Sequence, residues 1–359
     1  MKIHKIHEIT FDMEETILSA TVSKKNEIVM LLSSGLVGRY TINEPLGERL
    51  FSVIDNIGYT YGRFNLTAQT SLYTLDEIVV VVNDYKTDGY IHYPGKYHAL
   101  HFSRKDKCAD ISMYPLALYK NEDGVPHVIF AVAWNHIQIM NLDTRQILTA
   151  AKSLIEENAE EKHIEFYKKY SEDNKLFWPS PYDYFFGKLL MSPNRKRFLS
   201  VGWYWGSYDY YTVYDVENFI TSNRISDIPI GNWEHLNRST CWIDNDTIAV
   251  SYNPLIDDDE DATPESPFEI HFYKIDGKTA EIVKKIQVED KNILYSKLYY
   301  NKELDAFIVV SDKIGISILS LDGQILLKDE TLKVDEYSLE TGFFINTENK
   351  MITLYDIIE

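Results

Sequence analysis

Short apolar and β-branched runs alternate with polar turns along the whole chain, and one arrangement of them recurs. A short apolar strand leads into a polar turn, and a strongly apolar strand follows, as in VSKKNEIVMLL and LYTLDEIVVVV. This pattern predicts β-hairpins. They are centred near residues 25, 75, 122, 194, 245, 303 and 348, so the steps between them are 50, 47, 72, 51, 58 and 45 residues. Such spacing predicts a repeat of about fifty residues.

Further strands complete the repeat. Most hairpins are followed by a third strand that ends in a polar turn, such as GISILSLDG, and by a fourth, such as RQILTAA or QILLKDE. Four antiparallel strands repeated about seven times predict an all-β, seven-bladed β-propeller, because a blade buries both of its faces only by stacking in a closed ring. Two β-sandwich domains are the alternative, but sandwiches lack so regular a hairpin spacing.

The ends of the chain and one insertion complete this organisation. We expect residues 1–359 to form a single propeller domain. The seventh hairpin lies too close to the C-terminus to complete its blade, so the alternating segment 2–11 is expected to supply an outer strand and close the ring. An insertion at about residues 152–180, between blades 3 and 4, contains a predicted helix over 152–173. Its apolar stripe favours packing on the ring over a lid across one mouth.

One repeat resembles a known kind of propeller blade. MSPNRKRFLSV followed by YYTVYDVEN is similar to repeats of the WD-repeat and YVTN type, and the matching residues are Ser192, Pro193, Lys196, Tyr214 and Asp215. Elsewhere the resemblance is only topological, since the sequence contains no Trp-Asp dipeptide. The resemblance implies a propeller fold but no particular activity, because propellers serve both as binding scaffolds and as enzymes.

Charge and targeting signals narrow the range of partners. The chain has 36 basic and 55 acidic residues, a formal net charge of −19, which argues against nucleic acids and anionic membranes as partners. Cys108 and Cys241 are too few for a disulfide framework. The N-terminus lacks the apolar stretch of a secretory signal, and no apolar run is long enough to span a membrane. We therefore expect a cytoplasmic protein.

Motifs for metal binding or catalysis are weak. His4 and His7, and likewise His98 and His101, have H-x-x-H spacing, but on predicted strands such pairs point to opposite faces. The acidic run 257–261 lacks the glycine and the distal glutamate of a calcium loop. No G-x-S-x-G motif is present. The sequence therefore predicts no metal site and no cofactor, and it identifies no catalytic residue.

Aromatic residues are abundant in the loops, and 26 of the residues are tyrosines. In a propeller, the loops that enter the first strand of a blade and those that join its second and third strands open on the same face. The aromatic loops should therefore gather at one mouth of the channel, where exposed rings favour binding. Inter-blade packing is the alternative. The predicted ligand-binding residues are Tyr61, Arg63, Trp178, Tyr182, Asp183, Trp203, Trp205, Trp233 and His235.

Three functions are compatible with these observations. The first is a non-catalytic scaffold that recognises a protein, a peptide or a carbohydrate through the aromatic mouth. The second is a propeller hydrolase or lactonase, which needs a metal or convergent acidic and histidine side chains at the channel. The third is a structural propeller whose partners bind its rim. The first is preferred because it requires no catalytic motif.

Overall fold

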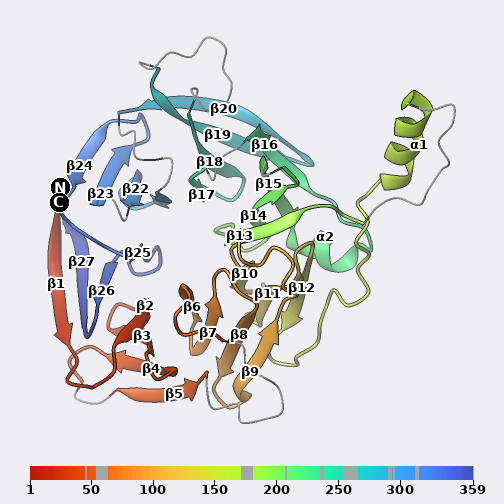
Figure 1. Cartoon of the computed structure of the whole chain (residues 1–359). Coiled ribbons are helices and arrows are strands. Elements are labelled where there is room, and N and C mark those ends of the chain that lie inside the picture. Colours follow the sequence, from red (N-terminus) through yellow and green to blue (C-terminus); the bar gives the residue numbers. More distant parts are fainter. Residues whose placement is uncertain are drawn as a thin grey trace.

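Seven antiparallel sheets surround a central axis (Figure 1). The computed structural model describes residues 1–44, 47–53, 64–170, 181–206, 208–234, 238–253, 266–289, 293, 296–311 and 315–358, without the side chains of residues 170 and 232–234. The seven-bladed propeller is confirmed, and the arrangement of two β-sandwiches is wrong. No helix within these ranges is long and apolar enough to cross a membrane.

The blades follow one another around the ring in chain order, beginning with the first three. Blade 1 contains β2 (Ile17–Lys24), β3 (Glu27–Leu32), β4 (Leu36–Thr41) and β5 (Glu48–Ser52). Blade 2 contains β6 (Thr70–Leu75), β7 (Ile78–Asn83), β8 (Asp88–Tyr93) and β9 (Tyr97–Ser103). Blade 3 contains β10 (Leu116–Lys120), β11 (Pro126–Ala133) and β12 (His136–Asn141).

The other four blades each have four strands. Blade 4 contains β13 (Phe185–Met191), β14 (Arg197–Tyr204), β15 (Tyr208–Asp215) and β16 (Ile228–Glu234). Blade 5 contains β17 (Thr240–Trp242), β18 (Thr247–Tyr252), β19 (Phe268–Asp276) and β20 (Thr279–Val288). Blade 6 contains β21 (Lys297–Asn301), β22 (Ala306–Ser311), β23 (Gly315–Ser320) and β24 (Ile325–Asp329). Blade 7 contains β25 (Glu336–Tyr337), β26 (Phe344–Glu348), β27 (Met351–Ile358) and the N-terminal β1 (Lys2–Thr10).

The N-terminal strand closes the ring, as the sequence predicted. β1 runs antiparallel to β27, in a register from Lys2 opposite Ile358 to Thr10 opposite Met351. The two chain ends therefore lie together at the edge of blade 7 (Figure 1). This pairing covers an outer edge of β27 that would otherwise be open to other chains.

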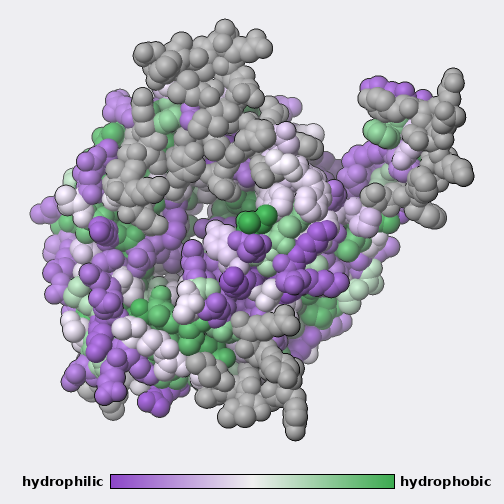
Figure 2. Space-filling view, viewed as in Figure 1, coloured by the Kyte–Doolittle hydropathy of each residue, from purple (hydrophilic) through white to green (hydrophobic). Residues whose placement is uncertain are grey.

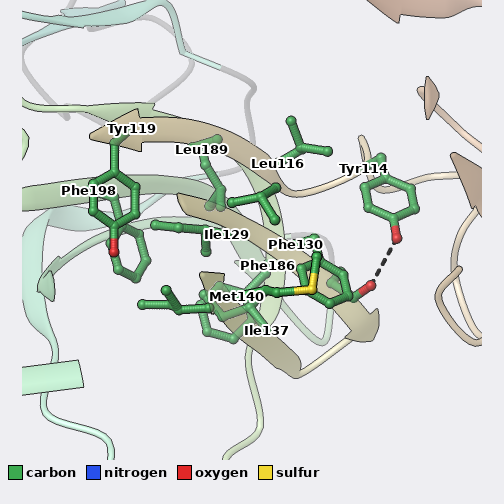
Figure 3. Close-up of a cluster of buried hydrophobic side chains, with 14 of the residues drawn as sticks. Tyr114, Leu116, Tyr119, Ile129, Phe130, Ile137, Met140, Phe186, Leu189 and Phe198 are labelled. Carbon is green, nitrogen blue, oxygen red and sulfur yellow. Dashed lines mark hydrogen bonds between the residues drawn. The ribbon is translucent and has the colours of Figure 1, made fainter. Parts of the chain in front are cut away.

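The core lies between neighbouring blades. Every residue of β3 and of β7 is buried, because the second strand of a blade is covered on both faces by the adjacent blades. Figure 3 shows the largest cluster, in which Ile129 and Ile137 of blade 3 meet Phe198 of blade 4. Other clusters join blades 1 and 2, 4 and 5, 5 and 6, 6 and 7, and 7 and 1. Continuous inter-blade burial explains why the second strands are the most apolar segments of the sequence.

Blade 3 lacks the fourth strand that was expected at RQILTAA. This segment begins to pair with β12, since the Asn141 amide donates to Gln146 O (2.9 Å) and the Leu148 amide to Ile139 O (2.8 Å). The hydroxyl of Thr149 then accepts the Ile139 amide proton at 2.9 Å, in the place of a backbone carbonyl. The ladder ends there, and only one bridge, between Met140 and Ile147, remains.

The insertion contains a shorter helix than expected. α1 spans Ala159–Tyr170 and projects away from the ring (Figure 1). Of the predicted apolar stripe, Ala159 is only 6% exposed, but Phe166 is 55% exposed, so the expected packing on the ring is wrong for Phe166. A second helix, α2 (Val216–Thr221), which the sequence did not suggest, follows β15. It begins because the Asp215 carboxylate accepts the Asn218 amide proton at 2.8 Å, as an N-cap.

Candidate functional site

Four aromatic side chains gather where blades 3 and 4 meet at one end of the channel. Trp134 lies in the turn between β11 and β12, Phe185 begins β13, Trp203 lies near the end of β14, and Trp205 lies in the turn after β14. We call these four residues the aromatic cluster. The strands β10 and β13 are neighbours along the channel, so the cluster lies beside its opening.

The cluster is held together by close ring contacts. Phe185 and Trp203 are cross-strand partners whose rings stack at 3.8 Å between centroids, with an interplanar angle of 11°. Trp134 approaches the other blade's Phe185 at 4.3 Å. Trp205 meets Phe185 edge-on at 4.6 Å and 90°. Offset and edge contacts of this kind stabilise aromatic groups beyond the area they bury.

Burial decreases from the centre of the cluster to its surface. Phe185 is 0% exposed, Trp134 and Trp203 are partly buried, and Trp205 is 49% exposed. The inner rings therefore serve inter-blade packing, whereas Trp205 presents about half of its surface to solvent. Different residues of this one cluster therefore fit the two hypotheses for the aromatic loops, inter-blade packing and an exposed surface.

Two polar side chains orient the indoles. The Trp203 indole N–H donates to the buried hydroxyl of Ser112 at 2.6 Å. The Trp205 indole N–H donates to the Asp183 carboxylate at 2.8 Å. Asp183 precedes the first strand of blade 4 and Trp205 joins the second and third strands. Their contact shows that these two kinds of loop do open on the same face.

A lysine ammonium lies over the outer rings. Lys107 Nζ is 4.8 Å from the centroid of the Trp134 ring and 5.1 Å from that of Trp205. Both distances are within the range of cation–π attraction. Lys107 is exposed and belongs to the loop that enters blade 3. With the loops of Trp134, Asp183 and Trp205, four loops of two blades therefore meet at the cluster.

The other predicted site residues have different positions. Tyr182 is only 4% exposed, and its hydroxyl bonds to the Tyr214 hydroxyl (2.7 Å) and the Asp227 carboxylate (3.1 Å), so it lies in the core and not at the surface where it was expected. Tyr61, Arg63, Trp178 and His235 lie outside the described residues, and Trp233 is described only as part of β16. The structure brings together Asp183, Trp203 and Trp205.

Sequence reasoning missed Trp134, Phe185, Lys107 and Ser112. One signal could have found Trp134, because it follows the second strand of blade 3 as Trp205 follows the second strand of blade 4. Equivalent turns of adjacent blades lie side by side on one face of a propeller.

The channel itself is charged as well as hollow. It contains a cavity of about 990 Å³, and Figure 2 shows an opening near the centre of the ring. Lys188 of β13 lies near Lys297 of β21, Glu336 of β25 and Asp84, which follows β7. Burial and the nearby Lys297 ammonium lower the pKa of Lys188, while the two acids oppose this effect. Burial raises the pKa of Asp84 despite the opposing Ser71, Gln69 and lysine groups.

Lowering the pH should therefore change the stability of the wild type relative to that of a variant with a neutral side chain at Asp84. A carboxyl whose pKa is raised by folding binds its proton more tightly in the folded state than in the unfolded state. Its ionised form therefore lowers the free energy of unfolding fully above the raised pKa, and this effect disappears as the pH falls toward about 4. The stability of the wild type relative to Asp84→Asn should therefore increase as the pH is lowered from neutral to about 4. Urea unfolding of both proteins measures this, and a difference that stays constant would contradict the assigned pKa direction.

Within the described ranges, no group of three or more His, Cys, Asp or Glu side chains is arranged to hold a metal ion, and residues 257–261 lie outside those ranges.

No family model matches the chain, and no curated protein sequence is similar to it. The propeller fold implied by the resemblance is confirmed, while membership of the WD-repeat or YVTN family stays a prediction.

Proposed function

We propose that this propeller is a non-catalytic binding scaffold that recognises a partner protein or peptide through the aromatic cluster. The observation that carries this proposal is the position of Trp205. It is 49% exposed, yet its ring and its indole N–H are held in place by Phe185 and Asp183. A rigid, half-exposed tryptophan gains little for folding and is the residue type most enriched among binding hot spots.

The polar groups of the cluster support binding more than catalysis. Ser112 and Asp183 both accept hydrogen bonds from indole N–H groups. These contacts fix the orientation of the two indole rings, and a preorganised surface favours binding. A partner that covers Trp205 would bury a rigid apolar surface with a polar rim, as the centres of protein interfaces do.

Replacing Trp205 by alanine tests whether the ring is there for folding. Because half of the side chain is exposed, we expect the free energy of unfolding to fall by only about 1 kcal/mol. Val283→Ala is a matched control, since Val283 is 61% exposed on the outer strand of blade 5 and should cost less than about 0.5 kcal/mol. A loss of about 3–5 kcal/mol for Trp205→Ala in urea unfolding would identify the ring as inter-blade core and remove the main support for the proposal.

A further inference from the structure

Trp134 and Trp205 form a V-shaped opening, which we call the indole notch. Their ring centroids are 6.2 Å apart and their planes meet at 59°. Lys107 Nζ completes a triangle with them, at 4.8 Å from the first ring and 5.1 Å from the second. An ammonium group therefore fits between the two rings at a distance where both attract it.

The surroundings of the notch favour positive charge. The faces of indole rings carry partial negative charge. Asp183 accepts the N–H proton of Trp205 at 2.8 Å, which places a carboxylate at the edge of the notch and increases the electron density of that ring. The whole chain carries a formal net charge of −19, so the long-range field also attracts cations.

The contacts that hold the Lys107 ammonium in the notch are its cation–π contacts with Trp134 and Trp205. Acidic residues outnumber basic ones by 55 to 36, yet no salt bridge joins Lys107 to an acid in the described part of the chain. Cation–π contacts at exposed sites are weak, so another cation can replace it.

The backbone of the Lys107 loop does not have to move for this exchange. The Arg104 guanidinium donates to Ala109 O at 3.0 Å and to Ser112 O at 2.7 Å, so these hydrogen bonds hold the backbone on the C-terminal side of Lys107 in place. The Lys105 amide also donates to Val132 O at 3.0 Å. Rotation of the Lys107 side chain toward solvent is therefore sufficient to open the notch.

We propose that the indole notch binds the ammonium group of a lysine side chain of a partner protein, and that Lys107 is a resident competitor that the partner displaces. This inference rests on the proposed function and names the chemistry that its surface recognises. A partner with exposed lysines also suits a protein whose net charge is −19.

Lys107→Met tests the proposal, because methionine keeps most of the length of the side chain and removes its charge. The probes are choline, a compact cation without N–H groups on its nitrogen, and its neutral isostere 3,3-dimethyl-1-butanol. In ligand-observed NMR titrations, we expect Lys107→Met to bind choline about tenfold more tightly than the wild type does. It should bind the neutral isostere far more weakly, and the further change Trp205→Ala should abolish choline binding.

Two results would overturn the inference. One is an equal affinity of the wild type and Lys107→Met for choline, and the other is equal binding of choline and its neutral isostere to Lys107→Met. Thermal melting of each variant verifies that it is folded. Lys107→Met/Trp134→Ala removes the other indole ring of the notch and should also lose choline binding. Failure of this experiment alone would leave the proposed function in place, since loss of a protein partner on Trp205→Ala is measured separately.

Discussion

A protein that lacks residues 2–11 is expected to lose about 4 kcal/mol or more of its free energy of unfolding, since cross-strand pairs contribute about 0.2–1 kcal/mol each. β1 forms eight registered pairs with β27 between Lys2 and Thr10, with one shift in register between Lys5 and His7. Its apolar side chains Ile3, Ile6 and Ile9 also pack against the clusters that join blade 7 to blades 6 and 1. Their loss exposes apolar surface and leaves β27 with an open edge.

Thermal melting and urea unfolding measure this effect. At about 2–4 °C per kcal/mol for chains of a few hundred residues, the melting temperature should fall by about 10 °C. Lys5→Ala in the full chain is the control, because Lys5 makes only an exposed salt bridge with Glu8, at 2.6 Å, and should change stability by less than about 0.5 kcal/mol. A truncated protein that melts at the temperature of the full chain would show that β1 does not hold the ring closed.

Trp203→Ala is expected to cost about 3–4 kcal/mol of stability, although this residue lies only two positions from Trp205. Its ring stacks on the fully buried Phe185 at 3.8 Å, and its indole N–H donates to the buried Ser112 hydroxyl at 2.6 Å. Alanine would open a cavity between blades 3 and 4 and leave the Ser112 hydroxyl without this donor.

Trp203→Phe largely separates the two contributions, because phenylalanine keeps a ring over Phe185 but loses the hydrogen bond to Ser112 together with part of the indole area. We expect it to cost about 1–2 kcal/mol in urea unfolding. If Trp203→Ala instead costs no more than Trp205→Ala, the two tryptophans share one environment and the gradient from core to surface within the cluster is incorrect.

The fold was predictable because each repeat carries its own local signal. Segments such as Ile78–Asn83, with five consecutive apolar residues after a polar turn, could only be strands covered on both faces. The unpaired N-terminal alternation of residues 2–11 likewise indicated the closing strand. The missing fourth strand of blade 3 gave no such signal, because a threonine hydroxyl that replaces a backbone acceptor at Ile139 depends on a geometry that strand patterns do not encode.

The site was only partly predictable for a different reason. Asp183, Trp203 and Trp205 lie near one another in the sequence and in loops whose face follows from the repeat. Lys107 lies almost a hundred residues before Trp205, in the loop that enters the neighbouring blade, and one lysine among many polar loop residues has no distinguishing pattern. Tyr182 shows the converse error, since a loop tyrosine beside the aromatic cluster is turned into the core by its bonds to Tyr214 and Asp227.

Comparative capture of partners most directly tests the claim that the aromatic cluster is a binding surface. Wild type, Trp205→Ala and Val283→Ala are immobilised in equal amounts, and the proteins that each retains from a lysate of the source cells are quantified. We expect at least one protein that the wild type and Val283→Ala retain equally and that Trp205→Ala binds about thirtyfold more weakly, because replacing a hot-spot tryptophan costs about 2 kcal/mol or more. Retention of the same proteins in the same amounts by all three would contradict the proposed role of the cluster.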